Sequence, residues 1–202
     1  MKLLVLGATG ATGRLVVDQA PAAGHTVRVL VRSPQELIAR PGLDVVAGQA
    51  TDAGDVTGAM TGVGAVISTL AAGSGTLITD AVQAVISGAA ATGVSRFVQL
   101  SFLAVPRECP STPAKLGSST AMTGMVEDEV AAEDALRASD LDYTLVRAVR
   151  LTDGPATGTT QQLPHSATLR MGKSISRADA AAWLLTALAD TTTSRRSVVI
   201  AG

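Results

Sequence analysis

Short apolar runs alternate along the chain with longer segments in which apolar residues recur at helical spacing. The first run is Lys2–Leu6, a helical pattern follows from about Thr12 to Ala22, and a second run covers Thr26–Val31. Runs of this length that are rich in Val and Leu are typical of strands buried on both faces of a sheet. The order strand, helix, strand predicts a βαβ unit and therefore a parallel sheet.

The alternation continues to the end of the chain. Further strands are expected at Asp44–Val46, Ala65–Ser68, Arg96–Leu100, Asp142–Val146, near Ala167–Arg170 and at Ser197–Ile200, and helices at about Ala53–Met60, Thr76–Thr92, Met122–Ser139 and from Ser176 onward. Together they predict a doubly wound, Rossmann-type α/β domain with helices on both faces of a mainly parallel sheet. The expected strand order is 3-2-1-4-5-6, with the last apolar run as a seventh strand.

One domain accounts for the 202 residues, because a chain of this length buries a single sizeable core. Residues 151–175 include a stretch rich in Gly, Thr and Gln and are expected to form a small substrate lobe. Two long segments, Ala104–Thr120 and Leu151–Ser166, follow strands. Ligands of such sheets bind at the carboxyl ends of the strands, so both segments are expected near the site. The sequence leaves open whether 104–120 acts as a lid.

The amino-acid composition argues against several classes of function and site. Aromatic residues make up only 2% of the chain and the net charge is −1, which argues against nucleic-acid binding. Cys109 is the only cysteine, and the histidines are His25 and His165, so neither a disulfide framework nor a His/Cys metal site is expected. The apolar run Leu3–Leu6 is too short for a signal or a membrane span. We expect a cytoplasmic monomer or homodimer that acts on a small molecule.

A glycine-rich turn follows the first strand. Glycines at 7, 10 and 13 let a backbone approach an anion closely, and the N–H groups of the next helix can then point at a phosphate. A tight structural turn is the alternative, but the strand before and the helix after favour nucleotide binding. Hydroxyl groups at 9 and 12 add donors. The turn reads Gly7-Ala8-Thr9-Gly10-Ala11-Thr12-Gly13.

The end of the second strand indicates which nucleotide is bound. An acid there would accept the ribose 2′-hydroxyl of NAD, but the sequence has Arg32 and Ser33, with no acid before Glu36. A guanidinium suits the 2′-phosphate of NADP. We therefore expect NADP(H) to be preferred over NAD(H), while an ordinary solvated arginine is the alternative interpretation.

With these residues, and with the segments 46–52 and 142–147, the chain resembles the atypical short-chain dehydrogenase/reductase family. It is most similar to the NAD(P)H-binding group that includes biliverdin reductase B, bacterial NADH–flavin reductases and NmrA-like proteins. The resemblance covers nearly the whole chain, including Leu151–Pro155 and Ile175–Asp179. It is specific for fold and cofactor and less specific for substrate.

The resemblance implies further cofactor contacts. Gly48, Gln49 and Ala50 would border the adenine, with Gln49 in place of the acid commonly found there. The nucleotide ribose or pyrophosphate would meet Leu70, Ala71 and Ala72. The nicotinamide end would meet Ser101 and Phe102.

The catalytic Tyr-x-x-x-Lys pair of many relatives is missing. The only tyrosine is Tyr143, inside an expected strand, and alignment on Glu133 puts Met125 and Glu129 at the two positions. Methionine carries no acidic proton, and a glutamate reverses the charge of the lysine, so neither is expected to act as proton donor. A flavin or quinone can accept hydride by stacking and proximity alone, which favours such acceptors over carbonyl compounds.

Five residues are candidates for catalysis or for contact with the acceptor. Ser101 is the leading catalytic candidate, although a hydroxyl that only closes a strand end is equally typical. Met125 is a candidate for contact with a flat ring, or for the core. Arg147 and Arg150 bracket the turn after the sixth strand and suit an anionic acceptor such as FMN, or are ordinary surface arginines. Phe102 is the last candidate for contact with the acceptor.

These interpretations predict an NADPH-dependent oxidoreductase that transfers hydride to a flavin, a quinone or a similar conjugated acceptor. A flavin would be a substrate and not a bound prosthetic group. The main alternative is an NmrA-like sensor that binds NADP(H) without turnover. An epimerase or dehydratase on the same scaffold is a third hypothesis, because fold does not determine chemistry.

Overall fold

The structure is a computed structural model that describes residues 1–38, 40–71, 75–102, 120–163 and 173–202, with the side chains of 120–122 excepted. Its strands are β1 (Lys2–Leu6), β2 (Thr26–Val31), β3 (Leu43–Ala47), β4 (Ala65–Ser68), β5 (Arg96–Phe102), β6 (Asp142–Ala148), β7 (Arg150–Thr152), β8 (Gln161–Leu163), β9 (Ser174–Ser176) and β10 (Arg196–Ala201). Its helices are α1 (Ala11–Gln19), α2 (Ala53–Met60), α3 (Leu77–Thr92), α4 (Thr120–Ala138) and α5 (Arg177–Ala187), with short 3-10 turns at Pro34–Glu36 and Thr191–Thr193.

The main sheet has the order β3-β2-β1-β4-β5-β6-β10-β8. The predicted order 3-2-1-4-5-6 is confirmed, and β10 is the expected seventh strand. All neighbours from β3 to β10 are parallel, whereas β8 pairs antiparallel with β10. The order reverses at β1, which pairs with β2 on one side and β4 on the other. A ligand crevice is expected beside this point, at the carboxyl ends of the strands.

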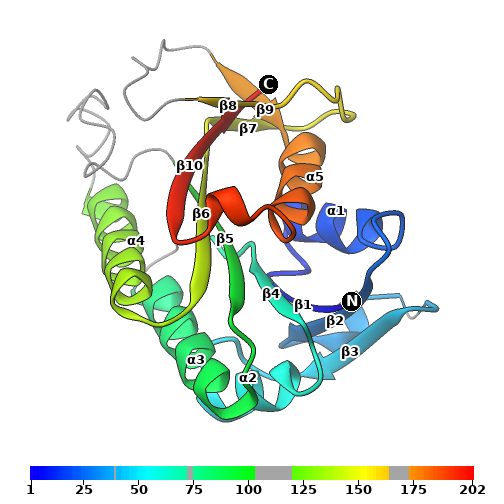
Figure 1. Cartoon of the computed structure of the whole chain (residues 1–202), viewed down its shortest axis with the longest axis vertical. Helices are drawn as coiled ribbons and strands as arrows, with labels where there is room; N and C mark the ends of the chain where they lie inside the picture. The colour runs from blue at the N-terminus through cyan, green and yellow to red at the C-terminus, as the bar shows by residue number, and fades with distance from the viewer. Residues whose placement is uncertain (39, 72–74, 103–119, 164–172) are drawn as a thin grey trace.

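Two apolar layers hold the sheet between helices. Figure 1 shows α1 and α5 on one face and α2, α3 and α4 along the other. Alternate residues of β1 supply the two layers, with Leu3 packing toward α1 and α5 and Leu4 toward the opposite helices. Since side chains of a strand alternate between faces, one apolar run serves both cores.

Buried carboxylates bind backbone N–H groups at the start of one helix and in one loop. The carboxylate of Asp128 in α4 accepts hydrogen bonds of 2.9 Å from the N–H groups of Ile78 and Thr79, in the first turn of α3. Asp179 in α5 accepts bonds of 2.9 Å from the N–H groups of Thr157 and Gly158. Such contacts satisfy N–H groups that have no partner within their own segment. Asp179 thereby ties the turn after β7 to α5.

The expected lobe contains small strands that the hydrophobic pattern did not indicate. β7 and β9 form a separate two-stranded parallel pair, and β8 forms the edge of the main sheet. Several predictions lie outside the described residues: the strand expected near 167–170, His165, Cys109, and residues 104–119 of the loop expected at 104–120. Among the described helices, none has the length and apolar character needed to cross a membrane.

Candidate functional site

The glycine turn is packed tightly between β1, β4 and α1. Gly7 has a positive φ of 80°, and a Cβ there would lie 2.9 Å from the N of Leu70. A Cβ on Gly13 would overlap the carbonyl oxygen of Gly7, which accepts the Gly10 N–H at 3.0 Å. Gly10 is the N-cap of α1 and offers no side chain to the helix. The first N–H groups of α1 therefore face an open crevice that suits an anion.

A pocket of about 180 Å³ extends from this turn across the ends of β1, β2 and β3. Segments that are far apart in sequence line this pocket, and six of the predicted cofactor-binding residues are among the lining residues. The lining residues are Gly7, Ala8, Thr9, Leu30, Val31, Arg32, Gly48, Gln49, Ala50, Thr51, Leu70 and Leu77. Arg32 and Gln49 are exposed there, and the backbone N–H of Gln49 donates to Asp55 at 2.8 Å.

The other predicted cofactor residues that the structure describes do not line this pocket. Thr12 is buried in the first turn of α1, Ala11 is exposed beside it, and Ser33 is half-buried at the start of the turn after β2. Ala71 is exposed, and Ala72 lies outside the described residues. Their contacts with a nucleotide stay predictions.

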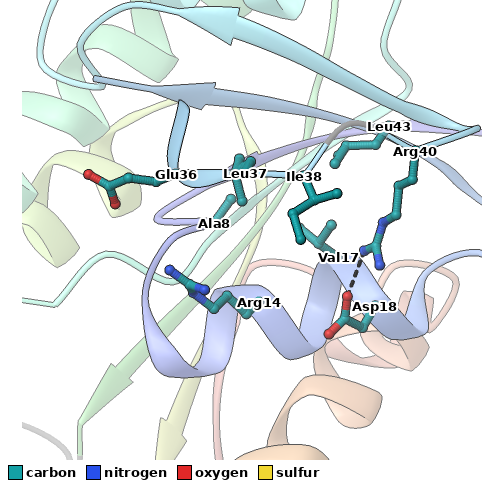
Figure 2. Close-up of a pocket in the computed structure, with 9 residues that line it drawn as sticks. All are labelled: Ala8, Arg14, Val17, Asp18, Glu36, Leu37, Ile38, Arg40 and Leu43. Carbon is teal, nitrogen blue, oxygen red and sulfur yellow. Dashed lines mark hydrogen bonds and ion pairs between the residues drawn. The ribbon is translucent and has the colours of Figure 1, made fainter. Parts of the chain in front are cut away.

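A second pocket of about 310 Å³ lies on the other side of Ala8, which lines both. Figure 2 shows it between α1 and the segment after β2, with Arg40 and Asp18 paired at 2.6 Å and Arg14 toward the opposite end. The Nε of Arg14 donates to the carbonyl of Thr9 in the glycine turn at 2.9 Å. Arg14 was not among the residues predicted from the sequence. Its position directly after the last glycine of the turn could have indicated a second cation close to that turn.

A buried polar cluster lies under the carboxyl end of β5. The Oγ of Ser101 is 3.2 Å from a carboxyl oxygen of Glu129 and 3.4 Å from one of Glu133. The side-chain amide of Gln99 reaches Glu129 at 3.4 Å. Ser101, Glu129 and Glu133 are each at most 5% exposed. Glutamates four residues apart lie on one face of α4, which is why both meet the same strand.

The two glutamates have different electrostatic surroundings. Burial away from water, reinforced by the charges of Glu133 and Asp128, raises the pKa of Glu129 from 4.5 to about 8, although hydrogen bonds with Ser101 and Gln99 act in the opposite direction. Glu129 therefore carries a proton at neutral pH. The expectation that position 129 offers no proton donor stays a prediction, and the raised pKa of Glu129 bears on it because burial favours the neutral, protonated form of a carboxyl.

Glu133 is ion-paired within the same cluster. Its carboxylate meets the guanidinium of Arg147 at 2.5 Å and that of Arg137 at 3.0 Å. Arg147 lies inside β6 and is fully buried, so the interpretation of Arg147 as an ordinary surface residue is wrong. Its contact with an anionic acceptor stays a prediction, and the geometry gives it a role in holding Glu133.

The remaining candidates lie around this cluster. Phe102 ends β5 and is half-buried, Met125 is half-buried one turn before Glu129, and Arg150 is exposed in β7. Tyr143 is buried in β6 with Arg195 over its ring, at 5.4 Å from the ring centroid. Within the described residues, no group of three His, Cys, Asp or Glu side chains could hold a metal ion.

Comparison with known proteins identifies what the chain resembles. Residues 7–191 match a family model described as NAD(P)H-binding. A segment of 104 residues is 41% identical to the (4-alkanoyl-5-oxo-2,5-dihydrofuran-3-yl)methyl phosphate reductase of Streptomyces griseus. That alignment covers 51% of this chain and 35% of the relative, so the match spans about a third of the relative's length.

Solved structures extend the resemblance to the whole chain. The anaerobillin reductase ChuY of Escherichia coli O157:H7 has a TM-score of 0.83 and 26% identity, with 99% of this chain and 96% of that chain covered. A short-chain dehydrogenase/reductase of Veillonella parvula in complex with NADP has a TM-score of 0.81 and 19% identity, covering 100% and 94%. The second likeness concerns the fold alone.

Proposed function

The chain belongs to the NAD(P)H-binding family, and we propose that it is a reductase that uses NADPH to reduce a small conjugated acceptor such as a flavin or a quinone. The observation that carries this proposal is the pocket that joins the glycine turn to Arg32. A phosphate cradle and a cation at the end of the second strand are the features that recognise the two ends of the adenosine portion of NADP.

The residues present fit the cofactor. A Cβ at Gly7 or Gly13 would fill the space against which the turn is packed, so the close backbone approach needed for a pyrophosphate is built into the chain. The proposal assigns the pyrophosphate to this turn, the 2′-phosphate to Arg32 with Arg14 nearby, and the adenine to Gln49 and Ala50. Bound NADPH would supply hydride, and Ser101 and Phe102 would border its nicotinamide.

The names of two similar proteins support a conjugated acceptor. The Streptomyces griseus relative is named as a reductase of an oxo-dihydrofuran, and ChuY as a reductase of anaerobillin. Both names describe reduction of a small organic molecule. Flavins and quinones are the simplest conjugated acceptors to test, because hydride transfer to them depends mainly on stacking and proximity.

Cofactor binding is tested first. Calorimetric titration of the wild type should give a lower Kd for NADPH than for NADH. Replacing Arg32 by alanine should raise the NADPH Kd by about tenfold and leave the NADH Kd unchanged, since one charge-assisted contact contributes about 1.5 kcal/mol. Arg196→Ala, an exposed change at the start of β10, is the matched control. An equal effect of Arg32→Ala on both cofactors refutes the NADP assignment.

Turnover is tested by following NADPH absorbance with FMN, riboflavin and a small quinone. Oxidation of NADPH that depends on both the protein and the acceptor supports the reductase. Tight NADPH binding with no turnover of any acceptor refutes it and favours the NADP(H)-binding sensor.

A further inference from the structure

The cluster at the end of β5 contains a group that the cofactor site does not use. Glu129 has a carboxyl that is 2% exposed and lies 3.2 Å from the hydroxyl of Ser101. Ser101 lies where the chain leaves the sheet at its carboxyl edge, next to the half-buried Phe102. A hydroxyl in this position can link a buried acid to a molecule bound above the sheet, because it both donates and accepts a proton.

Neighbouring charges keep the acid in its neutral form. Glu133 and Asp128, on the same helix, raise the pKa of Glu129 in addition to burial. Glu133 is paired with Arg147 of β6, while Asp128 is engaged by the N–H groups of α3.

Three other elements contribute groups around Glu129, and β6 supplies the cation Arg147, which is paired with Glu133 and lies opposite Ser101 in the sheet. β5 contributes the neutral groups of Gln99 and Ser101. On α3, Asp80 is bonded to Thr76 at 2.8 Å. Among the described residues, the groups that shift the pKa of Glu129 include no lysine or arginine. The proton on Glu129 is therefore retained at neutral pH and can be released when a stronger base appears at Ser101.

We propose that Glu129 is the proton source for the reaction, acting through Ser101, and that the acceptor is an α,β-unsaturated carbonyl compound or a related carbonyl compound. The inference rests on the proposed function and specifies the acceptor class. Hydride addition to such a molecule leaves a negative charge on its oxygen, and that oxyanion has to be protonated. A flavin has no comparable requirement for a positioned acid.

The proton transfers balance in two steps. As hydride from NADPH adds to carbon, the O–H bond of Ser101 breaks and its proton moves to the oxygen of the acceptor. The Oγ of Ser101 takes the proton of the Glu129 carboxyl, so that the hydroxyl is restored and Glu129 becomes a carboxylate. Water then returns a proton to Glu129. The reducing equivalents come only from NADPH.

The protonation state of Glu129 is measured on the free protein. Infrared spectra at stepped pH should show the carbonyl stretch of a protonated carboxylic acid at pH 7, and the band should disappear with a midpoint near the pKa of about 8. Glu129→Gln should remove the band. Glu127→Gln, on an exposed position of the same helix, should retain it. Absence of the band from the wild type at pH 7 overturns the inference.

The role of the proton is measured with cyclohex-2-enone as the acceptor and FMN for comparison. The kcat of the wild type with the enone should fall above about pH 8. Glu129→Gln should lower that kcat by about a hundredfold and remove the fall, and Ser101→Ala should do the same. With FMN the loss should be about tenfold smaller. Circular dichroism confirms that each variant is folded, and Glu127→Gln should keep both activities.

The outcomes separate the two proposals. A Glu129→Gln variant that reduces the enone with the wild-type pH profile overturns the inference and leaves the reductase intact. A wild type that reduces FMN but not the enone also overturns the inference alone. A wild type that binds NADPH and reduces neither acceptor refutes the proposed function and the inference together.

Discussion

Replacing Glu129 by glutamine should make the free energy of unfolding less dependent on pH. In the folded chain the pKa of Glu129 is about 8, against 4.5 for an ordinary glutamate. Between these values the folded chain keeps a proton that the unfolded chain has lost, so unfolding releases a proton and rising pH favours it. The stabilising effect of the raised pKa is fully present below about pH 4.5 and is lost as the pH rises through about 8.

The magnitude follows from the width of this window. Each pH unit within it lowers the free energy of unfolding by about 1.4 kcal/mol, so the full effect is at most about 5 kcal/mol. Glutamine has nearly the shape of a protonated glutamate and does not titrate. We expect Glu129→Gln and the wild type to have similar stability near pH 5, and the variant to be more stable by several kcal/mol near pH 9.

The assay is urea unfolding followed by circular dichroism, at about one-unit steps from pH 5 to pH 9. The quantity compared is the difference in unfolding free energy between variant and wild type at each pH. Glu127→Gln reports the effect of the same change on the solvent-exposed side of α4 and should give a flat difference. A difference for Glu129→Gln that is also flat would mean that Glu129 is ionised in the folded chain, and the reasoning about its proton would fail.

Three further substitutions test the fold and the cofactor cradle. Gly13→Ala should abolish NADPH binding in calorimetry, because its Cβ would overlap the Gly7 carbonyl oxygen. Arg147→Met should lower the unfolding free energy by about 3 kcal/mol in urea titrations, because the buried Glu133 loses its closest cation. Asp179→Ala should cost about 2 kcal/mol in the same assay, because the N–H groups of Thr157 and Gly158 lose their acceptor.

Much of the fold was predictable because most strands of the sheet can be recognised individually from their apolar residues in the sequence. β1 and β2 are mostly apolar segments followed by turn residues, and parallel strands joined through helices admit few orders. Element ends shifted by a few residues, as for α1, which ends at Gln19 and not near 22. β8 was missed because Gln161–Leu163 is three residues long and mostly polar, so it carries no periodic pattern.

The two halves of the candidate site differed in how far sequence could predict them. The glycine turn is local, so its spacing together with the strand before it and the helix after it indicated a nucleotide site, and Arg32 follows at the end of β2. The cluster at β5 depends on contacts between residues about thirty positions apart, which no local pattern reveals. Arg147 shows the same difficulty. The strand was expected to end at Val146, so Arg147 was assigned to the turn that follows. The observed strand 142–148 is buried and includes Arg147. A charged residue within such a strand needs a buried partner.

Glu129 and Glu133 show why residue type alone does not determine the protonation state of a buried side chain. Both are glutamates, both are buried, and both lie near Ser101 on the same face of α4. Glu133 has two arginine partners, whereas Glu129 has a serine, an amide and the charge of Glu133. Because two like charges so close together oppose each other, the pKa is raised at Glu129, which has no cation partner among the described residues. The proton donor that we propose in place of tyrosine and lysine is therefore the glutamate without a described cation partner, while the other glutamate holds the two arginines.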